Sequence, residues 1–582
     1  MSESTTRSSL SLNRRRFLNR SLLASGTLLV PVVISGCKNQ KSRQEMTWLD
    51  QLVGENDKAV EGLLEKQNTD PASQKFGGVP DQFDIYHPGS ASGLIQRFTG
   101  SYVSPSSGYF QKELLVGRME QAIDFLLMHQ HEDGTIDLLT TNFHSTPDTG
   151  FVVEPLAVSY FVLNKNGQQS TLPLQQKIRE FLLKAGDALA VGGIHTPNHR
   201  WVVSMAMARI NALFPDQKYL DRINQWLTEG IDIDADGQFT ERSTSVYSPL
   251  TDRCLMTIAR LTGREELYEP VRKNLDMTPY FIHPNGEIAT EVSRRQDQYR
   301  AATPARYHYP YRYMSRLDQN GLYGAMAQYI EENLGAENLS GDLIYYLEMP
   351  DLLQANPKTE LPTNYRKHFS VSDLVRIRRG NWDASILAKN AALVTFHHGN
   401  AVLQGVRMAS AFFGKGQFVA DSMEVDAGKI TLLQTLTGPY YQPIDPELIA
   451  ADGDWEKMPR RQRPKSEIQE MFYKLVVEET EKGLTLDFSA EGTDAVPVAI
   501  ELSFRSGGKL IGTEKAGHSE DVHFIKENTC TFQSGKDKIL ITGGRKEHEW
   551  TQLRGALPKI EGSSIYLTGF TPFQHGFSIE RD

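Results

Sequence analysis

The chain has 582 residues, of which 39% are hydrophobic and 23% charged, and its formal net charge is −10. This composition is typical of a soluble globular protein, and the length is sufficient for two to four domains. The acidic balance, with no basic arm, argues against nucleic acid as a partner.

The first residues resemble an export signal. The segment NRRRFLN (13–19) fits the twin-arginine pattern, with Arg14 and Arg15 as the pair, and the apolar stretch that follows ends in ISGC, a lipobox-like sequence with Cys37 as the lipidated residue. Ser, Gly and Pro interrupt the stretch, which is too short to span a membrane. We expect residues 1–36 to be a signal peptide rather than an ordinary apolar helix. The mature protein is then an exported lipoprotein of the periplasm or cell surface, attached to the membrane only by its lipid.

The next segment, from about residue 45 to 350, has a helical pattern. Apolar residues recur every three or four positions and most runs end at Gly. The predicted helices include 112–130, 149–167, 173–189, 199–214, 217–230, 248–263, 264–275 and 323–335. Helices of this length in antiparallel pairs predict an incomplete (α/α) toroid over residues 37–355, with an open helical array as the alternative.

The pattern changes after the segment NPKTELPTNYRKHF (356–369). Short alternating runs such as DLVRIRR, AALVTFHH and VPVAIELSF, separated by turn residues, predict an antiparallel β-sandwich over residues 365–582. The predicted class is therefore α+β multidomain, with a boundary near 355–365. Cys254 and Cys530 lie in different predicted domains, and their spacing does not suggest a disulfide.

Polar residues gather in four predicted loops of the helical segment. These loops are NFHSTPDTGF (142–151), HTPNHRW (195–201), DADGQFTERSTSVYSP (234–249) and a longer stretch over 283–313. Turns and helix caps favour such residues for backbone reasons alone, and Asn198 is itself a candidate cap. Because loops at one rim of a toroid line its cleft, the four loops together predict a single groove.

The residue types in these loops suit one reaction. Cleavage of a uronic-acid glycoside by β-elimination requires removal of the C5 proton, stabilisation of the charge on the neighbouring carboxylate and protonation of the leaving O4. An amide or guanidinium can bind the carboxylate, a neutral His or a Tyr phenolate can act as base, and a Tyr hydroxyl can act as acid. Asn198, His199 and Tyr247 supply this set.

These residues carry a family resemblance. An Asn-His pair that opens a helix, a Tyr about fifty residues later in an E-x-S-x-x-Y-like loop, and a β-sandwich after the helices resemble the heparinase II/III-like polysaccharide lyases, which include toroid alginate lyases. The resemblance implies that Asn198 binds the substrate carboxylate and that His199 is a base or charge neutraliser. It implies that Tyr247 is the general acid, and also the base in a syn elimination. The implied substrate is an anionic polysaccharide, and the chemistry requires no cofactor.

The same resemblance points to a histidine of the β domain. TFHHGN (395–400) contains His397 and His398, and we favour His398, beside Gly399, as a catalytic residue. Many relatives have Asn-Asn-His where this chain has Pro197 before Asn198. Some relatives hold a structural metal in the β domain, but the His, Asp and Glu residues here have no ligand spacing that supports one.

Further residues of the polar loops are candidates for substrate binding. A guanidinium pairs with a carboxylate or sulfate in a bidentate manner, so Arg294 and Arg295 suit an anionic sugar, although they could instead pair with Glu291 and Asp297. The candidates are Asn142, His144, Trp201, Glu241, Arg242, Arg294, Arg295, Tyr307 and Tyr309.

Two other functions compete with a lyase. A glycoside hydrolase on an α/α toroid needs two carboxylates at a defined separation, for which Asp148, Asp236 and Glu241 are candidates. A non-catalytic surface lipoprotein would bind glycans by aromatic stacking, for which the candidates are Trp201, Tyr307, Tyr309 and Tyr311.

Overall fold

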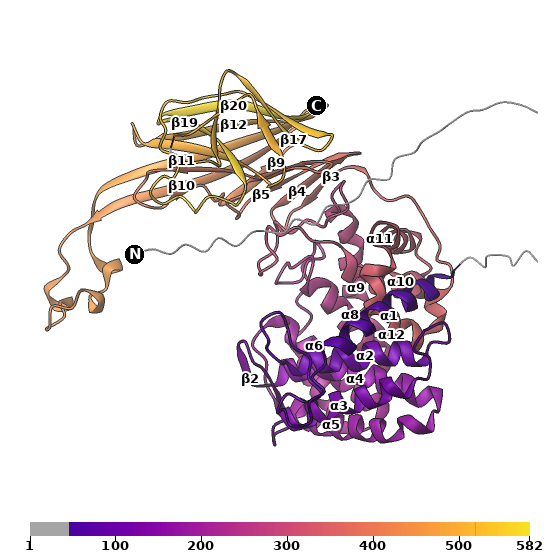
Figure 1. Ribbon diagram of the computed structural model, residues 1–582. Coiled ribbons are helices and arrows are strands. Elements are labelled where there is room, and N and C mark those ends of the chain that lie inside the picture. The colour runs from indigo at the N-terminus through magenta and orange to yellow at the C-terminus, as the bar shows by residue number, and fades with distance from the viewer. Residues whose placement is uncertain (1–45, 518) are drawn as a thin grey trace, which may run out of the picture. The chain divides into compact units, whose positions relative to one another are not determined.

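The computed structural model describes residues 46–517 and 519–582. The expected signal peptide (1–36) and lipidated Cys37 lie outside these residues. Thr47–Asp582 form one compact unit, in which the α-helices end at Glu348 and the first strand of the large sheets begins at Asn364 (Figure 1). Across the described part of the chain, every helix is too short or too polar to cross a membrane.

The helices form a closed series. The bounds are α1 (Trp48–Lys66), α2 (Pro88–Val103), α3 (Glu113–His129), α4 (Thr146–Asn166), α5 (Leu172–Val191), α6 (Pro197–Leu213), α7 (Gln217–Thr228), α8 (Tyr247–Thr262), α9 (Tyr268–Met277), α10 (His308–Asp318), α11 (Gly321–Leu339) and α12 (Leu343–Glu348). Helices α2, α4, α6 and α8 contact one another in order, and α3, α5 and α7 do the same. Because α1 also contacts α11 and α12, the ends of the series meet, which confirms the toroid and not the open array.

Helix α6 begins where the sequence predicts, but its cap differs from the expectation. Pro197 occupies the first helical position, where its missing N–H costs nothing, and Thr196 precedes it as the N-cap residue. Asn198 is therefore inside the first turn, and its side chain is free for contacts outside the helix. Behind it, the apolar face of α6 is buried in the core of the helical part, with Trp201 fully enclosed.

The C-terminal part consists of two large, mainly antiparallel sheets. One has the order β15-β16-β19-β13-β7-β6-β5-β4-β3, with β8 paired to β7, and the other has the order β14-β17-β18-β20-β12-β11-β10-β9. The first sheet comprises β3 (Asn364–Phe369), β4 (Leu374–Arg379), β5 (Trp382–Leu387), β6 (Val394–His398), β7 (Ala401–Ser410), β8 (Gly416–Gln417), β13 (Pro497–Phe504), β15 (Thr513–Lys515), β16 (Val522–Ile525) and β19 (Ser563–Phe570). The second comprises β9 (Ser422–Val425), β10 (Lys429–Tyr441), β11 (Lys465–Glu479), β12 (Gly483–Gly492), β14 (Lys509–Ile511), β17 (Thr529–Ser534), β18 (Asp537–Thr542) and β20 (Phe573–Arg581).

Alternating side chains of both sheets form one apolar core, which confirms the predicted sandwich. Cys254 is buried in the helical part and Cys530 in the sandwich, and both carry free thiols.

A turn of the same kind occurs before each of the helices α4, α8 and α10. In HEDGT (131–135), DADGQ (234–238) and HPNGE (283–287), the first residue donates its backbone N–H to the carbonyl of the fifth, at 2.8–2.9 Å. The fourth residue is a glycine with positive φ, and a Cβ on Gly134 would lie 2.2 Å from the backbone oxygen of Lys184. These turns follow α3, α7 and α9 and lead to α4, α8 and α10, so the loops that carry them lie at the same rim of the toroid.

Candidate active site

A buried ion pair joins the second, third and fourth polar loops. Asn198, only 2% exposed, donates Nδ2 to Oε2 of Glu241 at 2.6 Å, and Oε1 of Glu241 lies 3.2 Å from Nη1 of Arg295. Burial raises the pKa of Glu241, against the opposing effects of the Asn198 hydrogen bond and the Arg295 charge. Glu241 follows Asn198 by 43 residues, and Arg295 follows Glu241 by 54 residues. The three side chains nevertheless meet in one cluster at the start of α6.

 The three loops are therefore held together by side chains that the sequence places far apart.

Tyr247 lies against the same arginine. The guanidinium of Arg295 sits over the Tyr247 ring, 5.0 Å from its centroid, and Nε2 of Gln296 donates a hydrogen bond to the Tyr247 hydroxyl at 2.7 Å. Because the hydroxyl accepts from Gln296, its own proton remains available for another acceptor. The residue can therefore donate a proton.

His199 is half-buried beside this cluster. Burial, helped by the positive charges of His195 and Arg295 and opposed by Asp148, lowers the pKa of His199 to about 4. The imidazole ring packs edge-on against His195, 4.7 Å away between centroids, and against Phe151, 6.3 Å away. His199 is consequently neutral at neutral pH, the protonation state that a general base requires.

The first polar loop reaches the site through Asp148. Asn142 donates Nδ2 to Asp148 at 2.9 Å, and Asp148 in turn acts electrostatically on His199. His144 is exposed and lies apart from these contacts, because its ring stacks on His131 and pairs with Asp133. Asn142 is therefore connected to the site through Asp148, whereas the contacts of His144 are with His131 and Asp133 and not with the site.

The aromatic candidates for sugar stacking are buried, which corrects the expectation for Trp201, Tyr307 and Tyr309. Trp201 is 0% exposed and donates Nε1 to Asp232, while Tyr307 and Tyr309 are 1% and 2% exposed. A sugar cannot stack on a ring face that core residues already cover. Tyr311, at 0%, is equally enclosed.

The arginines of the loops have different roles. Arg242 donates to the backbone carbonyls of Val371 and Ser372, so it fixes the loop to the β segment and is not free to bind a sugar. Arg294 is exposed, and only its backbone N–H contacts Glu241. Arg295 pairs with Glu241, not with the alternative partners weighed from the sequence.

The histidine pair of β6 shows which side of the sheet faces the helices. His397 is buried and stacks on His283 of the helical part, with ring centroids 3.7 Å apart. The neighbouring His398 points to the opposite side, because side chains alternate along a strand, and its Nδ1 lies 2.7 Å from the carbonyl oxygen of Lys538. The expectation for His398 is thus corrected, since His397 is the one that meets the helical part.

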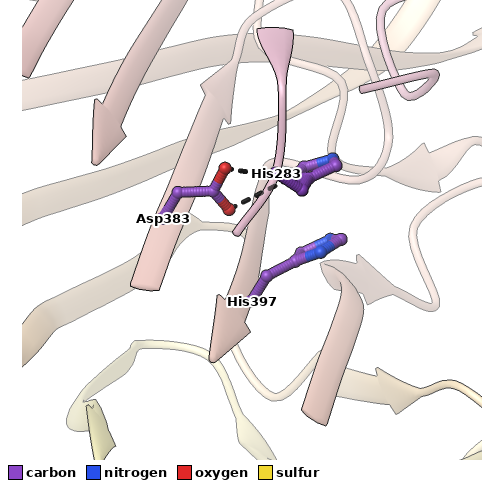
Figure 2. A group of neighbouring side chains, drawn as sticks. All are labelled: His283, Asp383 and His397. Atoms are coloured by element: carbon purple, nitrogen blue, oxygen red, sulfur yellow. Dashed lines mark hydrogen bonds and ion pairs between the residues drawn. The ribbon is translucent and has the colours of Figure 1, made fainter. Parts of the chain in front are cut away.

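His283, Asp383 and His397 form the one group among the described residues whose donor atoms could surround a metal ion, since these atoms lie within 4.8 Å of one another. Figure 2 shows Asp383 facing His283, with hydrogen bonds of 2.9 and 3.0 Å from Nδ1 to its two oxygens, and His397 beside them. Two imidazoles and a carboxylate suit zinc. However, Asp383 also pairs with Arg376, so its charge is already balanced in this arrangement. The donor set fits a metal, but a metal would have to displace the His283 hydrogen bonds.

Sequence reasoning missed several of these residues. Gln296 and His195 adjoin residues that the sequence singled out, but nothing in their own spacing marks them. His283 opens the turn HPNGE, which resembles HEDGT and DADGQ. The Asp-Gly or Asn-Gly pair that these turns share is a sequence signal that could have identified His283. Asp383 lies in a buried strand and has no sequence signal of its own.

Comparisons with known proteins agree with this architecture. No protein-family model matches the chain, and no curated protein matches its sequence. The solved xanthan lyase of Paenibacillus is similar in structure, with a TM-score of 0.53 and 10% identity, over 91% of this chain and 57% of that chain. This chain thus spans less than two thirds of the length of that lyase.

Two further solved structures have lower scores. The chondroitin AC lyase of Streptomyces coelicolor has a TM-score of 0.49 at 12% identity, over 94% of this chain and 80% of that one. Heparinase III has a TM-score of 0.46 at 11% identity, over 92% of both chains. At such identities the likeness concerns the fold alone. The chain therefore has the helical toroid and β-sandwich of the xanthan lyase fold.

Proposed function

We propose that the protein is a polysaccharide lyase that cleaves a uronic-acid glycan by β-elimination. The observation that carries this proposal is the cluster in which Arg295 contacts both Glu241 and Tyr247, with Asn198 bound to the same glutamate. It combines a carboxylate-binding group with a proton donor. The fold shared with a xanthan lyase supports the same reading.

The proton transfers fall to His199 and Tyr247. His199 is neutral and takes the C5 proton, or Tyr247 takes it as phenolate in a syn elimination. Tyr247 then protonates the leaving O4, so that the C4–O4 bond breaks as the C4–C5 double bond forms. Gln296 holds the Tyr247 oxygen in place without consuming its proton. No cofactor takes part in these steps.

Asn198 and Arg295 would bind the substrate carboxylate. One N–H of Asn198 is committed to Glu241, and the other makes a longer contact of 3.2 Å with Oγ1 of Thr196. Exchange of that longer contact for the substrate carboxylate costs little, because one hydrogen bond replaces another. Arg295 is about one-third exposed and has further N–H groups beyond the one directed at Glu241. Together they stabilise the charge that grows on the carboxylate as the proton leaves.

The competing functions have less support. A hydrolase needs an acid and a second carboxylate, but Asp236 accepts from the backbone N–H of Ser372, and Asp148 is held by Asn142 and Ser145. Only Glu241 of the three candidates lies in the cluster. A glycan-binding role would use aromatic faces that are buried here.

A panel of uronic-acid polymers tests the proposal. Alginate, heparan-type, chondroitin-type and plant or algal glucuronate polymers are each incubated with the protein, and near-ultraviolet absorbance of the unsaturated uronate is followed. We expect at least one polymer to yield the chromophore. New reducing ends without the chromophore would favour a hydrolase, and neither product would favour a binding protein.

We also propose that the protein is an exported lipoprotein, a proposal that rests on the sequence around Arg14, Arg15 and Cys37. Replacement of both arginines by lysine is expected to keep the protein inside the cell. Cys37→Ala is expected to move it from the membrane fraction to the soluble fraction. Unchanged fractionation of both variants would contradict the proposal.

A further inference from the structure

A cavity of about 660 Å³ adjoins the site inside the toroid. It is lined by residues of α2, α4, α8, α10 and α12 and of the short helices η4 (Ala305–Tyr307) and η5 (Ser340–Asp342), the last of which contributes Asp342. Phe151, which packs against the His199 ring, is part of the lining, as are Pro249 and Leu250, which follow Tyr247 on α8. Its volume is in the range of small-ligand sites, and neighbours of both proposed proton-transfer residues, His199 and Tyr247, line it.

Two arginines of this lining can offer N–H groups to a ligand, because Arg306 is exposed and the Arg253 side chain is about 30% exposed. Arg306 has no carboxylate within ion-pair distance among the described residues, and burial together with the positive charge of Arg253 lowers its pKa. Arg253 is 3.8 Å from Glu154, and its buried Nε has no hydrogen-bond partner in the described part of the chain. The like charges of Arg253 and Arg306 are close enough to act on each other.

The surrounding acids do not balance these charges. Glu154 is shared by Arg209 and Arg253 and also accepts from the Tyr345 hydroxyl, while Glu348 is shared by Arg209 and Arg260. The lining itself holds three arginines, Arg97, Arg253 and Arg306, against two carboxylates, Glu154 and Asp342, and Asp342 also pairs with His308. Of the three arginines, Arg97 is fixed by Asn56 and Ser340. The exposed Arg306 and the partly exposed Arg253 can therefore pair with an anion that enters the cavity.

We propose that this cavity binds a second anionic group of the glycan, carried by the sugar next to the one that is cleaved, through Arg253 and Arg306. The inference rests on the proposed lyase function and narrows it to glycans in which neighbouring sugars both carry negative charge. A carboxylate and a sulfate ester share the required chemistry, since a guanidinium can bind either in a bidentate manner. Neutral sugars would leave both arginines unpaired.

Calorimetric titration tests the cavity without any need for turnover. The titrants are glucuronate, glucose 6-sulfate and glucose, added to the wild type, to the Arg253→Gln/Arg306→Gln double variant, and to Arg316→Gln as control. Arg316 is a half-buried arginine of α10 that donates hydrogen bonds to Gln354 and Ala355, and it is not part of the cavity lining. We expect one or both anionic sugars to bind to the wild type and to Arg316→Gln, with affinity at least about ten-fold lower in the double variant.

The pattern of binding identifies the anion. Preference for glucuronate indicates a carboxylate, and preference for glucose 6-sulfate indicates a sulfate ester. Equal binding to the double variant, or glucose binding as tightly as the anionic sugars, would overturn the inference. So would the absence of any binding to the wild type.

Kinetics separate this inference from the proposed function. On a cleaved polymer, the double variant is expected to raise KM about ten-fold or more while kcat changes little, and added salt should weaken that difference. If the anionic sugars bind through the arginines but no polymer of the panel is cleaved, the lyase proposal fails and the anion site stands. If polymers are cleaved with the same KM by the wild type and the double variant, the anion site fails and the lyase stands.

Discussion

Two groups of charged side chains in this protein use similar residues in opposite ways. The rim site of Asn198, His199, Glu241, Tyr247 and Arg295 is partly open, with Arg295 about one-third exposed and Tyr247 half-buried. The interface cluster of His283, Glu291, Arg376, Asp383 and His397 is enclosed, and Arg376 and Asp383 are both 0% exposed. Each contains histidine, a carboxylate and an arginine.

The difference lies in how the polar groups are used. In the interface cluster, Asp383 binds both His283 and Arg376, and Glu291 binds Ser385, so that charges from the helical part and the sandwich are paired with one another. In the rim site, the Tyr247 proton and the remaining N–H groups of Arg295 are still available. Exposure and unused hydrogen-bonding capacity therefore distinguish a site for chemistry from a structural connection, whereas residue type does not.

The largest expected effect is that of Tyr247→Phe. Loss of the hydroxyl removes the proton donor, so we expect the rate of chromophore formation to fall by roughly 10²–10⁴. The melting temperature should change little, because Gln296 loses only a partly exposed partner. Initial rates and thermal melts measured in parallel check both statements. Full activity in this variant would show that Tyr247 is not the acid.

In the interface cluster, we expect Asp383→Asn to lower the stability of the protein, whereas Tyr247→Phe in the rim site lowers activity. This change removes the nearest counter-charge of the enclosed Arg376 and His283 and leaves only Glu291, 3.8 and 3.9 Å away, so we expect a loss of about 3–5 kcal/mol in the free energy of unfolding. The matched control is Glu478→Gln, which breaks an exposed pair with Lys429 and should lower the free energy of unfolding far less, because solvent screens that pair. Denaturant titration measures both. Equal stability of the two variants would contradict the structural role of the cluster.

The acid limb of the pH profile reports on His199. Burial lowers the pKa of His199 to about 4, so the neutral base persists as the pH falls from 7 to about 5. We expect kcat/KM to hold over that range and to decline only as the pH approaches 4. An ordinary histidine, with a pKa of about 6.5, would already lose activity between pH 7 and 6. A decline of that kind would mean that His199 is protonated more easily than its surroundings indicate.

The smallest effect is expected from removal of metal ions. Because side chains perform both proton transfers, treatment with a chelator should leave the initial rate within about two-fold of its untreated value. A metal held by His283, Asp383 and His397 would affect the melting temperature instead. Loss of activity on chelation, restored by added zinc, would place a metal in the reaction.

Much of the fold follows from local sequence patterns. The helices α3 to α9 and strands such as β13 and β19 coincide with runs of clear period, because their apolar faces point into one core. The long strands β10 and β11 were not predicted, although buried residues alternate at Met471, Tyr473, Leu475 and Val477 in the second half of β11; its first half is mostly exposed. Tyr307 and Tyr309 were predicted to be accessible for sugar stacking because they lie in a polar stretch of sequence. The structure instead buries both side chains in the core.

The site was predictable only in part. Asn198, His199 and Tyr247 stand out through their residue types and their position at helix starts. The pairing of Glu241 with Asn198 and Arg295 depends on how three loops meet, which no spacing in the chain records. The choice between His397 and His398 required the direction of each side chain from the strand. Tertiary contacts, not local pattern, decide such questions.

The most direct test of the central claim is the mass of the products formed in heavy-oxygen water. A polymer from the panel that the protein cleaves is digested in that solvent, and the fragments are analysed by mass spectrometry. β-Elimination adds no water, so we predict unsaturated fragments that contain no solvent oxygen. Fragments that carry one heavy oxygen at each new reducing end, without the unsaturated uronate, would contradict the account and identify a hydrolase.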